Sequence, residues 1–272
     1  KRLILYYPFQ INEYVENGRI LVLSYLYLYK KASFSLEDIK KNKYLSPAIK
    51  KEEVIILNNI NKLVKKAPRN ISLNYPKFLE KKLSQSLGNN FNTIMEFFMK
   101  RAPVYLRINQ NKVNIKDAKI KLENEGILCE ICLGSNFALK VISGEKFIKN
   151  SSSYQLGEVE LQDLSSQLTT ELIQISSEKK ILDFCAGSGG KALAIASRLK
   201  NRADIFAYDL NHIKYKDLIY RVNKAAAKIT ILDTKELIKY RNFFDIIFVD
   251  APCSGTGTWR RDPKIKWELN DQ

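Results

Sequence analysis

The chain has 272 residues, which is enough for two domains or for one large domain with a smaller appendage. Hydrophobic residues make up 45% of it, an ordinary globular value, so a sizeable core can form. The formal net charge of +16 indicates a polyanionic partner, with nucleic acid as the first candidate and an anionic membrane surface as the second. An AT-biased genome, which enriches Lys, Asn and Ile, is an alternative source of part of this charge.

Several features indicate a cytoplasmic protein. No apolar run in the sequence approaches the length of a membrane span, and the first residues, Lys1 to Ile4, lack the pattern of a cleavable signal. The four cysteines have no framework spacing, which favours a reducing compartment. The chain does not begin with Met, so we expect its start to be cut. We expect a cytoplasmic monomer that binds neither a membrane nor a metal.

The first 95 residues or so read as helical throughout. A dense apolar run at 19–31 is too short for a membrane span and predicts a buried helix. Apolar residues at helical spacing predict further helices at 50–66, 77–87 and 92–101. Lysines surround these segments. A solvated helical bundle and a basic module that docks on RNA explain that charge equally well.

A small α+β module follows at residues 102–155. Alternating side chains predict strands at 104–109, 127–133 and 138–142, with a helix at 115–125. Cys129 and Cys132 form a CxxC motif within a strand pattern. Because no second pair of cysteines accompanies it, neither a zinc site nor a redox site is expected.

Strands and helices alternate from residue 180 onwards. A helix is expected to begin at residues 161–167 and to end near 176. We expect a parallel, doubly wound sheet, because βα units alternate in this way when each crossover covers the sheet. Its predicted strands are 180–183, 204–208, 228–232 and 245–249, and its predicted helices are 191–199, 211–225 and 235–241.

A turn of small residues connects the first of these strands to its helix. Strand, glycine turn and helix form the first unit of a nucleotide-binding sheet, and the helix N-terminus points free N–H groups at the ligand. The spacing matches neither GxGxxG nor a Walker loop. The candidate ligand-binding residues of the turn are Cys185, Ala186, Gly187, Ser188, Gly189, Gly190 and Lys191.

An aspartate ends or follows each of the four strands: Asp183, Asp209, Asp233 and Asp250. Ligands of open α/β sheets bind beyond the carboxyl ends of the strands, so these carboxylates are expected at one rim. Asp209 is placed for ribose hydroxyls and Asp233 for an adenine amino group. An acidic rim would repel phosphates, and S-adenosylmethionine, a nucleoside with a sulfonium cation and an amino group, fits it.

The fourth strand leads into a cysteine between a proline and a glycine turn. Cys253 follows Asp250-Ala251-Pro252 at the expected ligand rim. Its neighbours in sequence, Arg260 and Arg261, would favour the thiolate. The alternative is a small buried hydrophobic residue.

These motifs resemble the RNA (cytosine-5)-methyltransferases of the Sun/Fmu (RsmB) type. The resemblance rests on DFCAGSGGK, YDL and DAPCSGTGTWRRDPKIKW, and extends to RAPVYLRIN at 101–109 and GEVELQDLSSQ at 157–167. It implies S-adenosylmethionine contacts at residues 185–191, Asp209, Asp233 and Asp250. The family usually has Ala-Pro where this chain has Gly187-Ser188. The RNA-binding residues expected from charge and from the resemblance are Arg101, Arg107, Arg260 and Arg261.

The resemblance also divides the cysteine chemistry between two residues. Methylation at carbon 5 of cytosine needs a thiolate that first adds at carbon 6. The family's Pro-Cys cysteine, here Cys253, is implied to assist product release, and the attacking cysteine lies in a later Thr-Cys motif. No Thr-Cys occurs in these 272 residues. We therefore expect a truncated chain whose nucleophile would follow Gln272.

The resemblance implies three domains: an all-helical NusB-like RNA-binding domain at 1–74, linker helices with the small α+β RNA-binding module at 75–156, and a Rossmann-like methyltransferase domain at 157–272 whose C-terminal part is missing. The expected function is methylation of carbon 5 of a cytosine in rRNA, with the small subunit first. The alternatives are a tRNA cytosine-5 methyltransferase, which the NusB-like start disfavours, and an inactive RNA-binding remnant.

Overall fold

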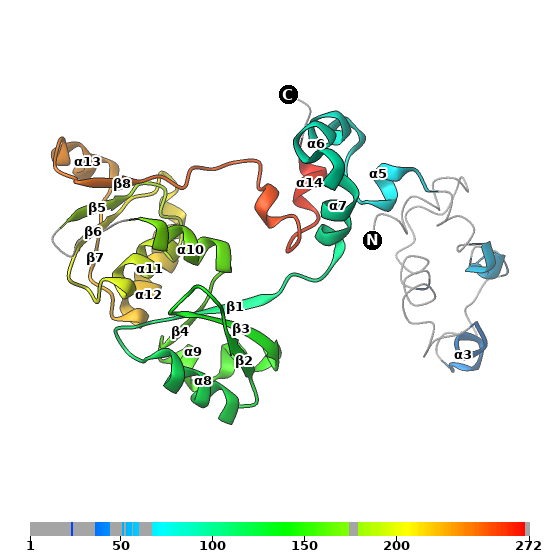
Figure 1. Cartoon of the computed structure of the whole chain (residues 1–272), viewed down its shortest axis with the longest axis horizontal. Coiled ribbons are helices and arrows are strands. Elements are labelled where there is room, and N and C mark those ends of the chain that lie inside the picture. The colour runs from blue at the N-terminus through cyan, green and yellow to red at the C-terminus, as the bar shows by residue number, and fades with distance from the viewer. Residues whose placement is uncertain are drawn as a thin grey trace. The chain divides into compact units, whose positions relative to one another are not determined.

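The computed structural model describes residues 36–43, 67–173 and 179–269, together with a few positions between 23 and 59. These residues form two compact units (Figure 1), one made of Lys1–Ala102 with Ser254–Gln272 and the other of Pro103–Cys253. Most of the run at 19–31 and most of the predicted NusB-like domain lie outside the described residues. The predicted boundaries at 74 and 156 therefore stay a prediction.

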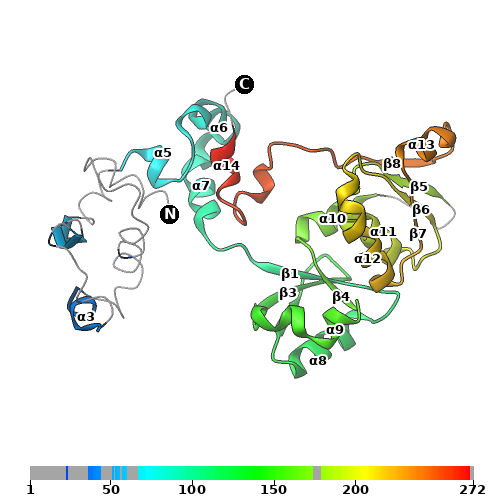
Figure 2. The ribbon, with the colours of Figure 1, turned by 180° about the vertical axis from the view of Figure 1, so that it is seen from behind.

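The first unit contains short helices from both ends of the chain. The aromatic and aliphatic side chains of Tyr75, Phe91 and Met95 form its core. The C-terminal segment packs here, since Trp259 lies edge-on to Phe98 and Trp267 Nε1 donates to Asn74 Oδ1 at 2.9 Å. The helices, in Figure 2 seen from behind, are α3 (Leu36–Lys41), α5 (Arg69–Ser72), η2 (Lys77–Leu79), α6 (Glu80–Leu87), η3 (Gly88–Asn90), α7 (Phe91–Met99), η7 (Thr256–Thr258) and α14 (Ile265–Glu268).

The predicted small α+β module is present in the second unit as an antiparallel sheet of order β2-β3-β1-β4. Its core lies between the sheet and the helix α8, whose Ala118 and Leu122 are fully buried. The elements are β1 (Val104–Ile108), α8 (Ile115–Asn124), β2 (Leu128–Ile131), β3 (Ala138–Ser143), η4 (Glu145–Asn150), α9 (Ser152–Gln155) and β4 (Val159–Leu161).

The helix predicted from residue 161 begins later than expected. Residues Val159–Leu161 form strand β4 against β1, and helix α10 covers Leu164–Leu172. Asp163 caps α10, because its side chain accepts the Ser165 N–H at 2.9 Å. A three-residue strand shows too little alternation to be recognised in the sequence.

The second sheet is parallel, as predicted, with strand order β7-β6-β5-β8. Strands β6 and β7 follow one after the other on one side of β5, and β8 pairs with the other side of β5. The topological switch therefore lies between β5 and β8. Ligands bind at such a switch. The strands are β5 (Lys180–Asp183), β6 (Asp204–Ala207), β7 (Ile229–Ile231) and β8 (Ile246–Phe248).

Helices cover both faces of this sheet. On one face, α11 (Gly190–Arg198) and α12 (Tyr215–Ala225) pack against alternate strand residues such as Ile181 and Ala207. On the other face, Phe206 packs among the rings of Tyr240, Phe243 and Phe244, which follow α13 (Thr234–Leu237) in η6 (Ile238–Tyr240) and the loop after it. A further 3-10 turn, η5 (His212–Lys214), precedes α12.

Buried polar contacts join the two sheets within this unit. Asn109, directly after β1, donates to the carbonyls of Gly157 at 3.0 Å and Ala225 at 2.8 Å. The Gln110 N–H donates to Ser197 Oγ at 2.8 Å, on helix α11. The small module is thereby connected to both helices that cover one face of the parallel sheet.

Candidate functional site

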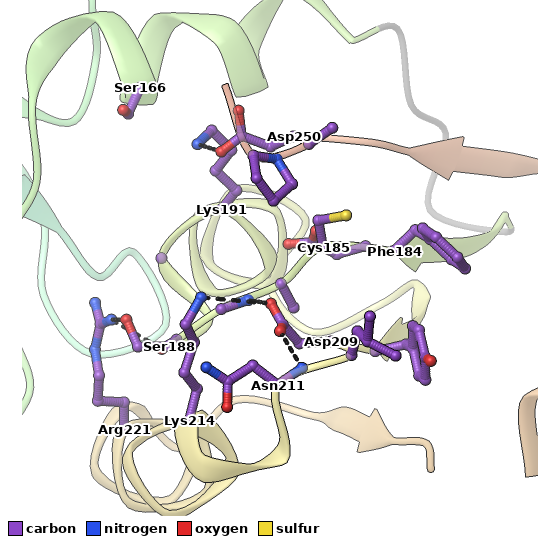
Figure 3. Close-up of a pocket in the computed structure, with 18 of the residues that line it drawn as sticks. Ser166, Phe184, Cys185, Ser188, Lys191, Asp209, Asn211, Lys214, Arg221 and Asp250 are labelled. Carbon is purple, nitrogen blue, oxygen red and sulfur yellow. Dashed lines mark hydrogen bonds and ion pairs between the residues drawn. The ribbon is translucent and has the colours of Figure 1, made fainter. Parts of the chain in front are cut away.

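A cavity of about 930 Å³ lies beyond the carboxyl ends of β5, β6 and β8. Three loops line it: residues 183–188 with Gly190 and Lys191, residues 208–211 with Lys214, and residues 250–253. Leu161, Gln162, Ser166 and Arg221 complete the wall. Ser166 and Arg221 are labelled in Figure 3. This volume is in the range of small-molecule and cofactor pockets.

The turn after β5 takes a shape that depends on glycine. Gly187 and Gly189 have φ angles of 56° and 84°, in the left-handed region. A Cβ on Gly189 would lie 2.3 Å from Leu218 Cδ1, so the turn packs directly on α12. Helix α11 starts at Gly190, and its first N–H groups have no partner within the helix. All the sequence-predicted turn residues line the cavity except Gly189, which packs against Leu218 of α12.

Asp209 holds this turn. Its Oδ2 accepts the Gly187 N–H at 2.7 Å, and its Oδ1 accepts the Asn211 N–H at 2.8 Å. The Lys214 ammonium lies 3.9 Å from Oδ2 (Figure 3). The residue is only 7% exposed, yet it faces the cavity. The carboxylate bound to the backbone of the turn is therefore that of Asp209.

Asp183 has a different environment. It is 1% exposed, and no group in the described residues makes a hydrogen bond of ordinary geometry to either carboxylate oxygen. Burial raises its pKa to about 7, and the nearby Lys191 ammonium and Ala192 N–H offset only part of that effect. The cavity thus contains a buried carboxyl group whose hydrogen-bonding capacity is largely unmet within the described residues.

Asp250 and Cys253 lie on the β8 side of the cavity. Lys191, from the first turn of α11, forms an ion pair with Asp250 Oδ2 across the switch point (Figure 3). Cys253 is exposed and lines the same cavity three residues later. The structure therefore brings the glycine turn and the Pro-Cys motif to one pocket, although they are some sixty residues apart.

Asp233 does not line this cavity with the other three aspartates. Its Oδ1 accepts the Glu236 N–H at 2.7 Å, and Glu236 Oε2 accepts the Asp233 N–H at 2.9 Å. The two bonds form a capping box at the start of α13. The expectation that all four carboxylates line one rim is wrong for this residue. Its contact with an adenine stays a prediction.

The four arginines predicted to bind RNA lie in different environments. Arg107 is 2% exposed and donates to groups inside the second unit, so its assignment as a surface contact for RNA is wrong. Arg260 lies over the Phe97 ring and donates to the carbonyls of Lys100 and Arg101. Arg101 and Arg261 are exposed, and their contact with RNA stays a prediction.

Several polar residues of the pocket wall were not predicted from the sequence, among them Gln162, Asn211, Lys214 and Arg221. Arg221 donates to both the backbone and the side-chain oxygen of Ser188, at 2.8 Å each. It lies in the middle of α12 among other charged residues, and no local pattern distinguishes it from a solvated helix face.

The described residues contain no group of three or more His, Cys, Asp or Glu side chains placed to hold a metal ion. In the CxxC motif Cys129 is buried, and burial raises its pKa to about 11. None of the helices in the described part of the chain has both the length and the apolar character needed to cross a membrane.

Two family models match the chain in the regions that form these two sheets. Residues 170–272 match the 16S rRNA methyltransferase RsmB/F model, and residues 75–144 match the ferredoxin-like domain of RsmF/B-like methyltransferases. The chain belongs to the RsmB/F family.

Named relatives of the RsmB/F chain include enzymes for both ribosomal subunits. It is 34% identical over 167 residues to the probable ribosomal RNA small subunit methyltransferase B of Bacillus subtilis, covering 60% of this chain and 37% of that protein. It is 31% identical over 174 residues to the 28S rRNA (cytosine-C(5))-methyltransferase of Mus musculus, covering 62% and 22%. The chain thus spans less than two fifths of the length of these relatives.

A solved structure has the same fold. NSun6 from Pyrococcus horikoshii with SFG superposes with a TM-score of 0.63 at 17% sequence identity, covering 73% of this chain and 75% of that one. At this identity the likeness shows the Rossmann-like fold and carries no assignment of individual residues.

Proposed function

We propose that this RsmB/F chain binds S-adenosylmethionine in the cavity and serves the methylation of carbon 5 of a cytosine in rRNA. The observation that carries the proposal is the joint placement of the glycine turn, Asp209 and Cys253 around one cavity at the switch point. The small subunit is the first proposed target, in keeping with the Bacillus subtilis relative. The four free thiols suit the proposed cytoplasmic setting.

The residues present fit this cofactor. The turn has no Cβ at Gly187 or Gly190 to keep a ligand from the backbone. Asp209 uses one lone pair of each oxygen on a backbone N–H, and each oxygen retains another for a ribose hydroxyl. The buried carboxyl of Asp183 and the exposed carboxylate of Asp250 suit a ligand that carries an ammonium group and a sulfonium cation.

S-adenosylmethionine supplies an electrophilic methyl group when it is bound. Cytosine carbon 5 is a weak nucleophile until a thiolate adds at carbon 6, and the adduct later loses the carbon 5 proton and expels the thiolate. Cys253 is the cysteine that lines the cavity beside the Pro-Cys turn. Following the resemblance, we assign it to the release step and the attack to a second cysteine.

Loss of Cys253 separates these two roles. In the release role, Cys253→Ala leaves RNA covalently bound to a form of the protein that also carries the Thr-Cys motif, because addition by that second cysteine proceeds and elimination stalls. In the attacking role, the same substitution abolishes the adduct. Gel electrophoresis of labelled RNA after incubation with S-adenosylmethionine distinguishes the two, and the absence of an adduct in the variant, when the parent forms one, would contradict the release assignment.

The substrate is tested in cells. Bisulfite sequencing of rRNA and tRNA from cells with and without the gene is expected to show one rRNA cytosine that loses its methyl group. Loss confined to a tRNA would replace the proposed substrate with the tRNA alternative. If calorimetry shows that S-adenosylhomocysteine does not bind the purified protein, the proposal fails at the cofactor.

A further inference from the structure

A buried arginine of the small sheet reaches the glycine turn of the neighbouring parallel sheet. Arg107 is the fourth of the five residues of β1, and its guanidinium Nη1 donates to Gly190 O at 2.6 Å and to Gln162 Oε1 at 2.8 Å. Gln162 in turn donates to the same Gly190 carbonyl at 3.1 Å. The first carbonyl of α11 therefore accepts two hydrogen bonds from residues that follow or form strands of the other sheet.

A second set of hydrogen bonds connects the same pair of strands to this turn. Glu160 in β4 lies directly opposite Arg107 in the antiparallel register. Glu160 accepts from Arg221 Nε at 3.1 Å, and Arg221 donates to the Ser188 carbonyl and hydroxyl at 2.8 Å each. Strands β1 and β4 thus hold the turn at two points, Ser188 and Gly190, on either side of Gly189.

Two of these three charged side chains are buried, and Arg221 is partly exposed where it lines the cavity. Glu160 is 4% exposed and Arg107 2% exposed, and Arg107 Nε has no hydrogen-bond partner in the described residues. Desolvation lowers the pKa of Arg107 to about 10, in spite of the neighbouring Glu160. Burying a guanidinium costs free energy. An apolar residue here would avoid that cost but could not donate to the turn.

Arg107 does not line the cavity, whereas Gln162, Ser188, Gly190 and Arg221 all do. We propose that Arg107 is a positioning residue for the cofactor: it fixes the peptide group of Gly190, and with it the direction of the N–H groups that face the ligand. This inference rests on the proposed binding of S-adenosylmethionine. It makes the small sheet, assigned only to RNA so far, a part of the cofactor site.

Affinity for S-adenosylhomocysteine, measured by calorimetry, tests the proposal with two substitutions at one position. Arg107→Met retains the apolar stem and removes the donors, and it leaves Glu160 and Arg221 as a neutral pair. We expect it to weaken binding about 10- to 100-fold, the range of a lost hydrogen bond to a charged group. Arg107→Lys restores a cationic donor of similar reach and is expected to recover most of the affinity.

A matched control removes a buried link of similar kind that does not touch the turn. Asn109, two residues along the chain from Arg107, donates to the carbonyls of Gly157 and Ala225. Asn109→Ala is expected to lower the melting temperature without changing the affinity by more than about twofold, which separates positioning from general loosening.

The outcomes separate the two proposals. If the parent protein binds S-adenosylhomocysteine and Arg107→Met binds equally well, the positioning role is overturned and the proposed function stands. If Arg107→Lys is as weak as Arg107→Met, or Asn109→Ala loses as much affinity, the effect is structural and the role is again overturned. If the parent protein does not bind, the proposed function itself fails.

Discussion

Removal of the Asp209 carboxylate is expected to be the most damaging single change to cofactor binding. Asp209 accepts the backbone N–H groups of Gly187 and Asn211 at 2.7 and 2.8 Å, so Asp209→Ala frees the turn and the following loop together. A hydrogen bond to a charged group is worth roughly 1.5–3 kcal/mol. Part of this loss is recovered when the loops relax. We expect binding of S-adenosylhomocysteine to weaken by about 2–4 kcal/mol, or about 30- to 1,000-fold.

Loss of the Asp183 carboxylate is expected to weaken cofactor binding less than loss of the Asp209 carboxylate. Asp183 is buried in the same cavity, but its oxygens hold no part of the turn, so Asp183→Ala is expected to cost less than about tenfold in affinity. Asp204→Ala is the matched control, because Asp204 is exposed at the opposite end of β6. Calorimetric titration of the three variants decides the order. Equal losses for Asp209 and Asp183, or a larger loss for Asp183, would refute the reasoning.

Three further outcomes are expected. Burial raises the folded-state pKa of Asp183 to about 7 from the ordinary 3.8, so the folded protein retains a proton there that the unfolded chain loses, and this group's contribution to stability falls by about 3–5 kcal/mol as pH rises from about 4 to 7. Asp183→Asn should therefore flatten that part of the pH profile of unfolding, and an unchanged profile would contradict the burial argument. Gly189→Ala combines a φ of 84° with a Cβ 2.3 Å from Leu218 Cδ1 and is expected to destabilise the protein by about 1–3 kcal/mol, seen as a lower melting temperature; an unaltered melting temperature would show that the turn adapts. Affinity for an rRNA fragment should fall steeply as salt is raised from 50 to 200 mM, because a chain of net charge +16 releases counterions from the phosphates, and a flat dependence would remove the electrostatic basis for RNA binding.

Local pattern was sufficient for the elements that build the parallel sheet. The alternation of apolar runs and helical stretches predicted all four of its strands, because each strand is a short buried segment bounded by turn residues. The same pattern placed Asp183, Asp209 and Asp250 at the carboxyl ends of strands, and a parallel sheet brings those ends to one edge. The glycine turn and the Pro-Cys motif could therefore be associated with one pocket from the sequence alone.

The roles of individual side chains at this pocket were decided by contacts between distant segments. Arg107 has the same alternating neighbours as a surface strand residue, and only the packing of β1 against the start of α11, 83 residues later, buries it. Strand β4 forms because β1 offers it an edge for pairing. Asp233 is the exception, because its side chain caps α13 through a local capping box with Glu236, three residues away. The sequence determines which elements form, since propensity and periodicity are local. Which polar group faces the ligand depends on what fills the space beside it, and tertiary structure alone determines that.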